Sequence, residues 1–239
     1  MTIREEFDKR VAEINSFYEI LSIIELENPH ISANKIEDKS IVEVELQINS
    51  SKVDTLRSTT YLLLYNLIES TVYNSIVSVF DEISDKGLKY FDIVEDVQKY
   101  WLNNLYKHDD KKKKETIIET IMNVANQIFN NTIALASNEV NYGGSLNART
   151  IFKTAKSLNI DIGNVRRIYD ENTHGITLND IKQKRNWLAH GEKSFIEVGS
   201  TSSFNQLKEA KDYVVAFLSE FISAVETYII NQRFKKVAV

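Results

Sequence analysis

Hydrophobic and polar positions along most of the chain alternate with the period of an α-helix. Within residues 3–27, apolar side chains recur every three or four positions, at Ile3, Phe7, Val11, Ile14, Tyr18 and Leu21. This spacing predicts an amphipathic helix. Residues 52–85 are apolar nearly all round, which is typical of a helix packed on several sides. Residues 88–106, 115–137 and 146–158 give three further predicted helices.

One segment alternates with the period of a strand instead. In "SIVEVELQI", residues 40–48, apolar residues such as Val44 and Leu46 alternate with Glu43 and Glu45. This pattern predicts a β-strand. A lone strand is not stable, so we expect it to pair with another segment, either in the same chain or in a second copy of it. The preceding segment "ENPHISANKIEDKS", residues 27–40, is polar and predicts a loop.

A shorter predicted helix, residues 177–190, carries the most unusual cluster of side chains. Thr177 followed three residues later by Asp180 is a reasonable start signal. Gly191 is a natural terminator, because glycine readily adopts the left-handed conformation that ends a helix. The following residues, 192–202 ("EKSFIEVGSTS"), predict a loop.

A long closing helix is predicted from Ser203 to about Arg233, because Ser203 and Gln206 have the spacing of a capping box. Neither a repeat nor a convincing linker interrupts the chain. We therefore predict an all-α domain over residues 51–239, preceded by an extension of one helix and one strand over residues 1–50.

The composition supports a helical protein with a core. The chain of 239 residues holds only 7 Gly and 1 Pro, and 43% of its residues are hydrophobic. It has no Cys, which excludes disulfides, thiolate catalysis and cysteine-bound zinc. We expect neither a signal peptide nor a membrane-spanning segment, and we predict a cytoplasmic protein. The net charge of −5 argues against bulk electrostatic binding of nucleic acid, but leaves a local basic patch possible.

The unusual cluster is "RNWLAH", residues 185–190. Successive helical residues turn by ~100°, so Asn186 and His190 share a face. Arg185 lies about 140° from His190 around the axis, but its long side chain can swing toward the imidazole. Trp187 and Leu188 are expected to point toward a core. The cluster has two interpretations: a cation that favours the helix C-terminus, worth ~0.3–1 kcal/mol, or a reactive site.

Glu69 is a second conspicuous residue, because it lies in the apolar stripe of the segment 52–85. A carboxylate in apolar surroundings is costly unless it is paired. Arg185 is an attractive partner, because its guanidinium fork matches a carboxylate. The alternative is that Glu69 lies at a helix edge and reaches water.

Arginine, asparagine and histidine together suit the cleavage of RNA. Histidine can move protons near neutral pH, and arginine can stabilise negative charge on a phosphoryl group. This chemistry needs no metal, and the sequence has neither a His-Glu-x-x-His pattern nor a spaced acidic set. We therefore expect no metal and no cofactor. A second histidine from a dimer partner would complete an acid–base pair.

The cluster resembles the Arg-x4-His signature of the HEPN superfamily. "LLLYNLIESTVYNSI" at 62–76 is similar to the central helix of a bacterial MAE-like branch, and "LNARTIFKTAKSL" and "RNWLAHGEKSFIEVG" resemble it in order and spacing. The resemblance covers roughly residues 40–230. It implies a helical bundle around a long helical hairpin, with the motif at a helix end.

The resemblance also implies a function. Many members are metal-independent endoribonucleases that act as homodimers, and they resemble toxins of toxin–antitoxin pairs and anti-phage or abortive-infection effectors. Arg185 and His190 match the catalytic pair, Asn186 matches the polar position, and Glu69 would be the supporting acid. The residues that could contact RNA are Arg149, Lys184 and Lys193. The alternative is a non-catalytic module that binds RNA or a protein such as an antitoxin.

Overall fold

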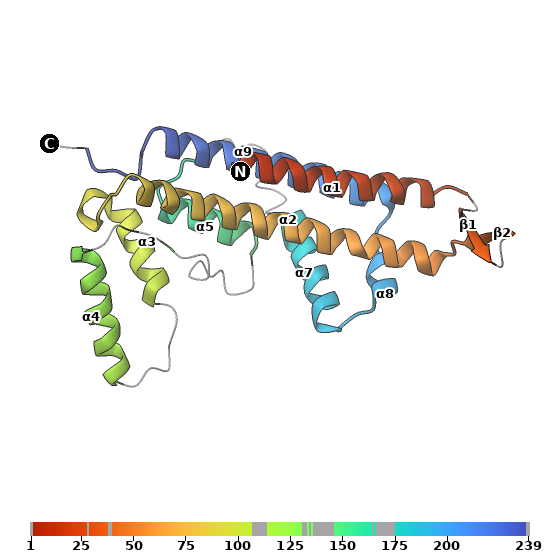
Figure 1. Cartoon of the computed structure of the whole chain (residues 1–239), viewed down its shortest axis with the longest axis horizontal. Coiled ribbons are helices and arrows are strands. Elements are labelled where there is room, and N and C mark those ends of the chain that lie inside the picture. Colours follow the sequence, from red (N-terminus) through yellow and green to blue (C-terminus); the bar gives the residue numbers. More distant parts are fainter. Residues whose placement is uncertain are drawn as a thin grey trace. The chain divides into compact units, whose positions relative to one another are not determined.

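The computed structural model describes residues 2–27, 29–37, 40–106, 114–130, 133, 135, 146–163, 165 and 175–237. It is mostly helical, in agreement with the predicted all-α class. Figure 1 follows the elements from the N-terminus in red to the C-terminus in blue. The chain divides into two compact units. Unit 1 consists of Met1–Arg4, Ile68–Gly175 and Ala216–Val239, and unit 2 consists of Glu5–Leu67 and Ile176–Val215. These units do not divide the chain at residue 50, and the boundary predicted there stays a prediction.

Unit 2 holds most of α1 (Ile3–Ile24), the strands β1 (His30–Glu37) and β2 (Ser40–Gln47), and the first half of α2 (Ser50–Asp85). It also contains three C-terminal segments: α7 (Ile176–His190), α8 (Phe195–Gly199) and the first part of α9 (Phe204–Ile230).

Polar contacts hold α1 against α9 within unit 2. The hydroxyl of Tyr18 donates to the carbonyl oxygen of Leu207 at 2.9 Å, and Lys211 Nζ donates to Asn15 Oδ1 at 2.9 Å. The buried apolar side of α1 consists of Phe7, Ile14, Tyr18, Leu21 and Ile24. These are the helical-period positions of the sequence, with Val11 less buried, so the predicted helix is confirmed.

The predicted strand is confirmed, and its partner lies in the same chain. β1 and β2 pair antiparallel, with Ile31 opposite Leu46 and Ala33 opposite Val44. The polar loop predicted over residues 27–40 is therefore wrong at residues 30–37, because backbone pairing with β2 makes this polar sequence a strand. Ile31, Val44 and Leu46 are each about half exposed, at 49%, 48% and 49%.

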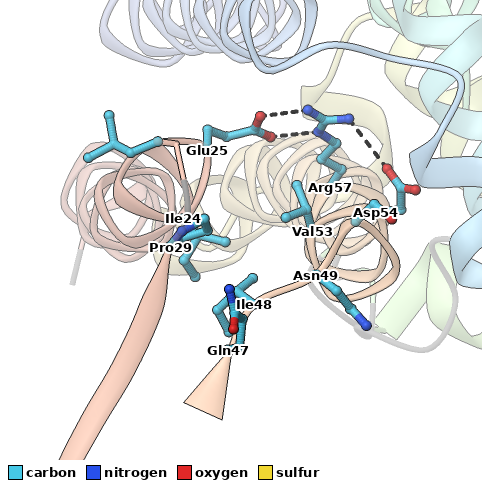
Figure 2. A pocket seen from close by; sticks show the side chains of 11 residues that line it. Ile24, Glu25, Pro29, Gln47, Ile48, Asn49, Val53, Asp54 and Arg57 are labelled. Atoms are coloured by element: carbon cyan, nitrogen blue, oxygen red, sulfur yellow. Dashed lines mark hydrogen bonds and ion pairs between the residues drawn. The ribbon is translucent and has the colours of Figure 1, made fainter. Parts of the chain in front are cut away.

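An ion-pair cluster lies where the hairpin joins α2. Arg57 donates from Nε and Nη2 to both carboxylate oxygens of Glu25 at 2.5 Å, and from Nη1 to Asp54 at 3.3 Å. Figure 2 shows these pairs at the edge of a cavity of about 340 Å³. Pro29 and Ile48 line the same cavity. The charged residues that line this cavity, Arg57, Glu25 and Asp54, are thus paired with one another.

Unit 1 contains the second half of α2, the 3-10 turn η1 (Tyr90–Asp92), α3 (Glu95–Tyr106), α4 (Lys114–Asn130), α5 (Ala148–Ser157) and the rest of α9. Backbone bonds close this unit, since Val94 N–H donates to Phe234 O at 2.9 Å and Lys236 N–H to Asp92 O at 2.9 Å. The helix predicted over 88–106 begins later than expected, because η1 occupies its first residues. Residues 131–137 of the predicted helix 115–137 lie largely outside the described residues.

α9 meets the length and composition expected of a membrane-spanning helix, with a mean hydropathy of 1.5 in its most apolar window. The expectation that no segment could span a bilayer is wrong on that criterion. Within unit 1, however, Phe217, Phe221 and Val225 of α9 are fully buried. Arg4 binds the hydroxyls of Ser219 and Ser223 on the same helix. A buried apolar stripe beside a bound polar face is typical of a core helix.

Candidate functional site

α7 docks within unit 2 through an apolar side and ends in a defined turn. Leu178, Ile181 and Leu188 are buried. Gly191 has φ +69°, and the N–H groups of Gly191 and Glu192 donate to Leu188 O at 3.4 Å and Trp187 O at 2.9 Å. These two bonds form a Schellman motif, which confirms the predicted helix end.

Lys184 holds α7 against the rest of unit 2. Its buried ammonium donates to Tyr61 Oη at 2.9 Å, Ser202 Oγ at 3.1 Å and Asp180 Oδ2 at 2.9 Å. Burial alone lowers the pKa of Lys184, but the bonds to Tyr61 and Asp180 outweigh it and raise the pKa above its ordinary value. Because an ammonium has three N–H donors, all are engaged within the chain. No donor of Lys184 is left for a phosphate, which argues against the expected contact between Lys184 and RNA.

Arg185 is held in a fixed orientation by its neighbours in unit 2. Its guanidinium carbon lies 4.2 Å from the centre of the Tyr65 ring, and Nη1 donates to Asn186 Oδ1 at 3.0 Å. The Tyr65 ring is fully buried, whereas Arg185 is half-buried. A planar guanidinium stacked on a ring loses little further rotational freedom when it binds an anion. The predicted supporting residue, Asn186, thus contacts the predicted arginine directly.

His190 is the last residue of α7, and its side chain is exposed. Asn186 lies four residues earlier, so both residues occupy one face of the helix, as predicted. Neither the guanidinium at 185 nor the imidazole at 190 is enclosed in a core. An exposed imidazole is accessible to a phosphodiester in solution, and a half-buried guanidinium still offers part of its surface to one.

Trp187 differs from its prediction, because it is half-buried and contributes to the surface. The ammonium of Lys193 lies 3.6 Å from the centre of the Trp187 ring. Lys193 folds back onto α7 through the glycine turn, and its backbone N–H donates to Trp187 O at 3.4 Å. Leu188 is buried, as expected.

Two other predicted residues lie in unit 1. Glu69 is half-buried on α2, and its predicted pairing with Arg185 stays a prediction. Arg149 is exposed in the first turn of α5, whose N-cap Asn147 accepts from Thr150 N–H at 2.9 Å. An exposed arginine is available to a ligand, but Arg149 is not in the same unit as Arg185.

No group of three or more histidine or acidic side chains in the described part of the chain could hold a metal ion. His30 lies exposed on β1. His108 and His174 are outside the described residues. Among the described residues, His190 and Arg185 on α7 are the histidine and the arginine with the smallest separation in sequence.

Sequence reasoning missed the side chains that position this cluster. Tyr65 lies within the apolar segment 52–85, and nothing in that pattern indicates that its ring supports a guanidinium. Tyr61 and Ser202, which bind Lys184, gave no distinct pattern. The ion pair of Asp180 with Lys184 has i,i+4 spacing, and that spacing was a usable signal.

These features define a helical protein whose polar cluster of arginine, asparagine and histidine lies at the end of a docked helix. The family model MAE_28990-like HEPN matches residues 1–234. The chain therefore belongs to this HEPN family, and the suggested resemblance is confirmed. Comparisons with curated proteins and with solved structures give no significant match.

Proposed function

We propose that the protein is a metal-independent endoribonuclease of the HEPN type, with Arg185 and His190 as its catalytic residues. The observation that carries this proposal is the arrangement at the end of α7. The arginine is held by Tyr65 and Asn186, while His190 is open to solvent. Membership in the HEPN family supports the proposal, because Arg185 and His190 match the catalytic pair expected of that family.

The chemistry follows from these two side chains. An imidazole nitrogen of His190 takes the proton of a ribose 2′-hydroxyl, and the 2′-oxygen attacks the adjacent phosphorus. The guanidinium of Arg185 stabilises the extra negative charge of the five-coordinate phosphate. The bond to the 5′-oxygen then breaks, and that oxygen receives a proton. The products are a 2′,3′-cyclic phosphate and a 5′-hydroxyl.

The proton for the leaving oxygen requires an acid as well as a base. Each chain brings one His190, so we propose a homodimer in which a second copy supplies the other imidazole. Asn186 keeps the guanidinium oriented, and Glu69 is proposed as a supporting acid. We further propose that the protein acts in the cytoplasm as a toxin or an anti-phage, abortive-infection effector.

Purified protein incubated with total RNA and EDTA tests the activity. We expect fragmentation with the wild-type protein and none with His190→Ala. His30→Ala is the matched control, because His30 is also exposed but lies on the hairpin, away from α7 in sequence. RNA that stays intact with the wild-type protein, or cleavage that survives His190→Ala, would reject the proposal.

The acidic net charge of −5 is unusual for a protein that binds RNA and favours a second candidate, a non-catalytic module that binds a partner protein such as an antitoxin. Expression toxicity separates the two candidates. A nuclease is toxic when expressed alone, and His190→Ala relieves the toxicity. A binding module keeps its partner when Arg185 and His190 are each replaced by alanine.

A further inference from the structure

Trp187 and the proposed catalytic residue His190 are three positions apart on α7. Residues three apart on a helix are neighbours on its surface, so Trp187 and His190 flank the same patch of α7. The chain has only two tryptophans, and the other, Trp101, is 1% exposed within unit 1. The half-buried indole of Trp187 contributes a flat apolar surface near the proposed phosphodiester site.

One contact of the indole is with a cation. Lys193 Nζ lies 3.6 Å from the centre of the ring, and the Schellman turn at Gly191 brings it there. The Lys193 side chain is itself half-exposed, so its ammonium can leave the ring without crossing a core. A cation–π contact at an exposed site is weak. The stacking of a nucleobase on an aromatic ring is stronger.

We propose that Trp187 stacks an unpaired base next to the linkage held at Arg185 and His190, and that Lys193 moves from the ring to a backbone phosphate. This inference rests on the proposed function and names its substrate class, single-stranded RNA. Bases in a duplex are stacked on one another and are not offered to a protein side chain. The same residues thus select unpaired RNA without reading a sequence.

Quenching of tryptophan fluorescence by acrylamide tests the stack in the unmodified protein. Trp101 is buried, so quenching reports mainly on Trp187, and the Trp187→Phe protein gives the baseline for Trp101 alone. The probe is a short single-stranded RNA of mixed sequence with 2′-O-methyl groups, which cannot be cleaved by 2′-hydroxyl attack. We expect this RNA to lower quenching toward that baseline, whereas inorganic polyphosphate, which can bind Lys193 but cannot stack on the ring, does not lower it.

Affinity for the same probe gives a second readout. Stacking of one base is worth about 5- to 150-fold in affinity, so Trp187→Ala should weaken binding by about tenfold or more. Trp187→Phe retains a ring and should bind within about threefold of the wild type. Lys193→Gln should lower the salt dependence of binding by about one ion, while RNA still protects Trp187.

The inference is overturned if bound RNA leaves the quenching of Trp187 unchanged, if Trp187→Ala binds as tightly as the wild type, or if a duplex protects the ring as well as the single strand does. Its failure is distinguishable from that of the proposed function. Protection of Trp187 in a protein that never cleaves RNA would reject the nuclease only. Cleavage by a protein whose Trp187 is never protected would reject the stack only.

Discussion

Arg185 and Lys184 are adjacent cations on α7, yet their surroundings give them different roles. The guanidinium of Arg185 lies on the Tyr65 ring and is half-buried, whereas the ammonium of Lys184 is bound to Tyr61, Ser202 and Asp180. Arg185 can therefore contact a ligand while Tyr65 keeps its guanidinium oriented. Lys184 instead fixes α7, the helix that carries Arg185.

This difference predicts distinct outcomes for two lysine substitutions. Lys184→Met removes a charge-assisted network and should lower the free energy of unfolding by about 1–2 kcal/mol. It should leave the salt dependence of RNA binding unchanged. Lys193→Gln is the matched control. Since Lys193 is only half-buried, this variant should keep the free energy of unfolding and reduce the salt dependence of RNA binding. Denaturant unfolding and binding at several salt concentrations provide both measurements. A smaller salt dependence of RNA binding in Lys184→Met would instead support the expected contact between Lys184 and RNA.

The buried tyrosines predict a loss of stability in alkali. Burial raises the pKa of Tyr18 and of Tyr228 well above the ordinary value near 10. Unfolded tyrosines ionise near that pH while the folded ones keep their protons, so rising pH favours the unfolded state. The raised pKa of Lys184 acts in the same direction.

The free energy of unfolding should therefore be nearly constant between about pH 7 and 9, as far as these groups decide it, and should fall above about pH 10. Denaturant titrations across this range measure it, and the fall should be less steep in Tyr18→Phe. Stability that does not decline in alkali would contradict the burial of these hydroxyls.

Among the helices, the short α8 follows the glycine turn that ends α7. Its capping box is formed by Ser194 and Glu197, and Glu197 accepts from Ser194 N–H at 2.7 Å. The helix ends at Gly199, which packs directly against α2. A Cβ built on Gly199 would lie 1.8 Å from the backbone oxygen of Asp54. Only glycine allows these two backbones to approach so closely.

Gly199→Ala should therefore destabilise the protein by about 1–3 kcal/mol or more, because backbone atoms must move apart. Gly163→Ala is the matched control, since its Cβ would meet only a side-chain oxygen of Asp161, at 3.3 Å. Thermal unfolding of both variants measures the difference. Equal melting temperatures would show that α8 does not pack on α2 as described.

Periodicity predicted the long helices well, because each buries a stripe of apolar side chains. The capping box of Ser203 and Gln206 was predicted and is present, with Ser203 N–H bound to Gln206 Oε1 at 2.9 Å. The box of Ser194 and Glu197 has the same spacing, but it lies in a segment too short for a helical period. That segment was predicted as a loop and is α8, so the loop prediction is wrong.

The remaining errors come from long-range pairing. β1 has a polar sequence, and only its partner β2 makes it a strand. At the candidate site, the sequence predicted the turn at Gly191, which is confirmed, while the roles of Arg185, Asn186 and His190 stay a prediction. It could not identify Tyr65 as the support of Arg185, because the two are 120 positions apart (185 minus 65) and meet only in the folded unit.

At the scale of the whole molecule, the proposed activity depends on two chains. If a composite cleft forms in a homodimer, the second imidazole comes from the partner chain. An excess of His190→Ala protein, mixed with the wild-type protein and allowed to exchange subunits, should therefore lower the wild-type activity, because a mixed dimer holds only one imidazole. Cleavage assays on the mixture measure this, and wild-type protein diluted with buffer alone is the control. Wild-type activity that the excess leaves unchanged would indicate that each chain acts by itself.

His190 and Arg185 are proposed to cleave RNA by attack of the 2′-hydroxyl. Analysis of the product ends after incubation in EDTA is the decisive test of this mechanism. We predict 2′,3′-cyclic phosphate and 5′-hydroxyl ends, formed by the wild-type protein and not by His190→Ala. Products with 5′-phosphate and 3′-hydroxyl ends, or cleavage of RNA whose 2′-hydroxyls are all methylated, would contradict it.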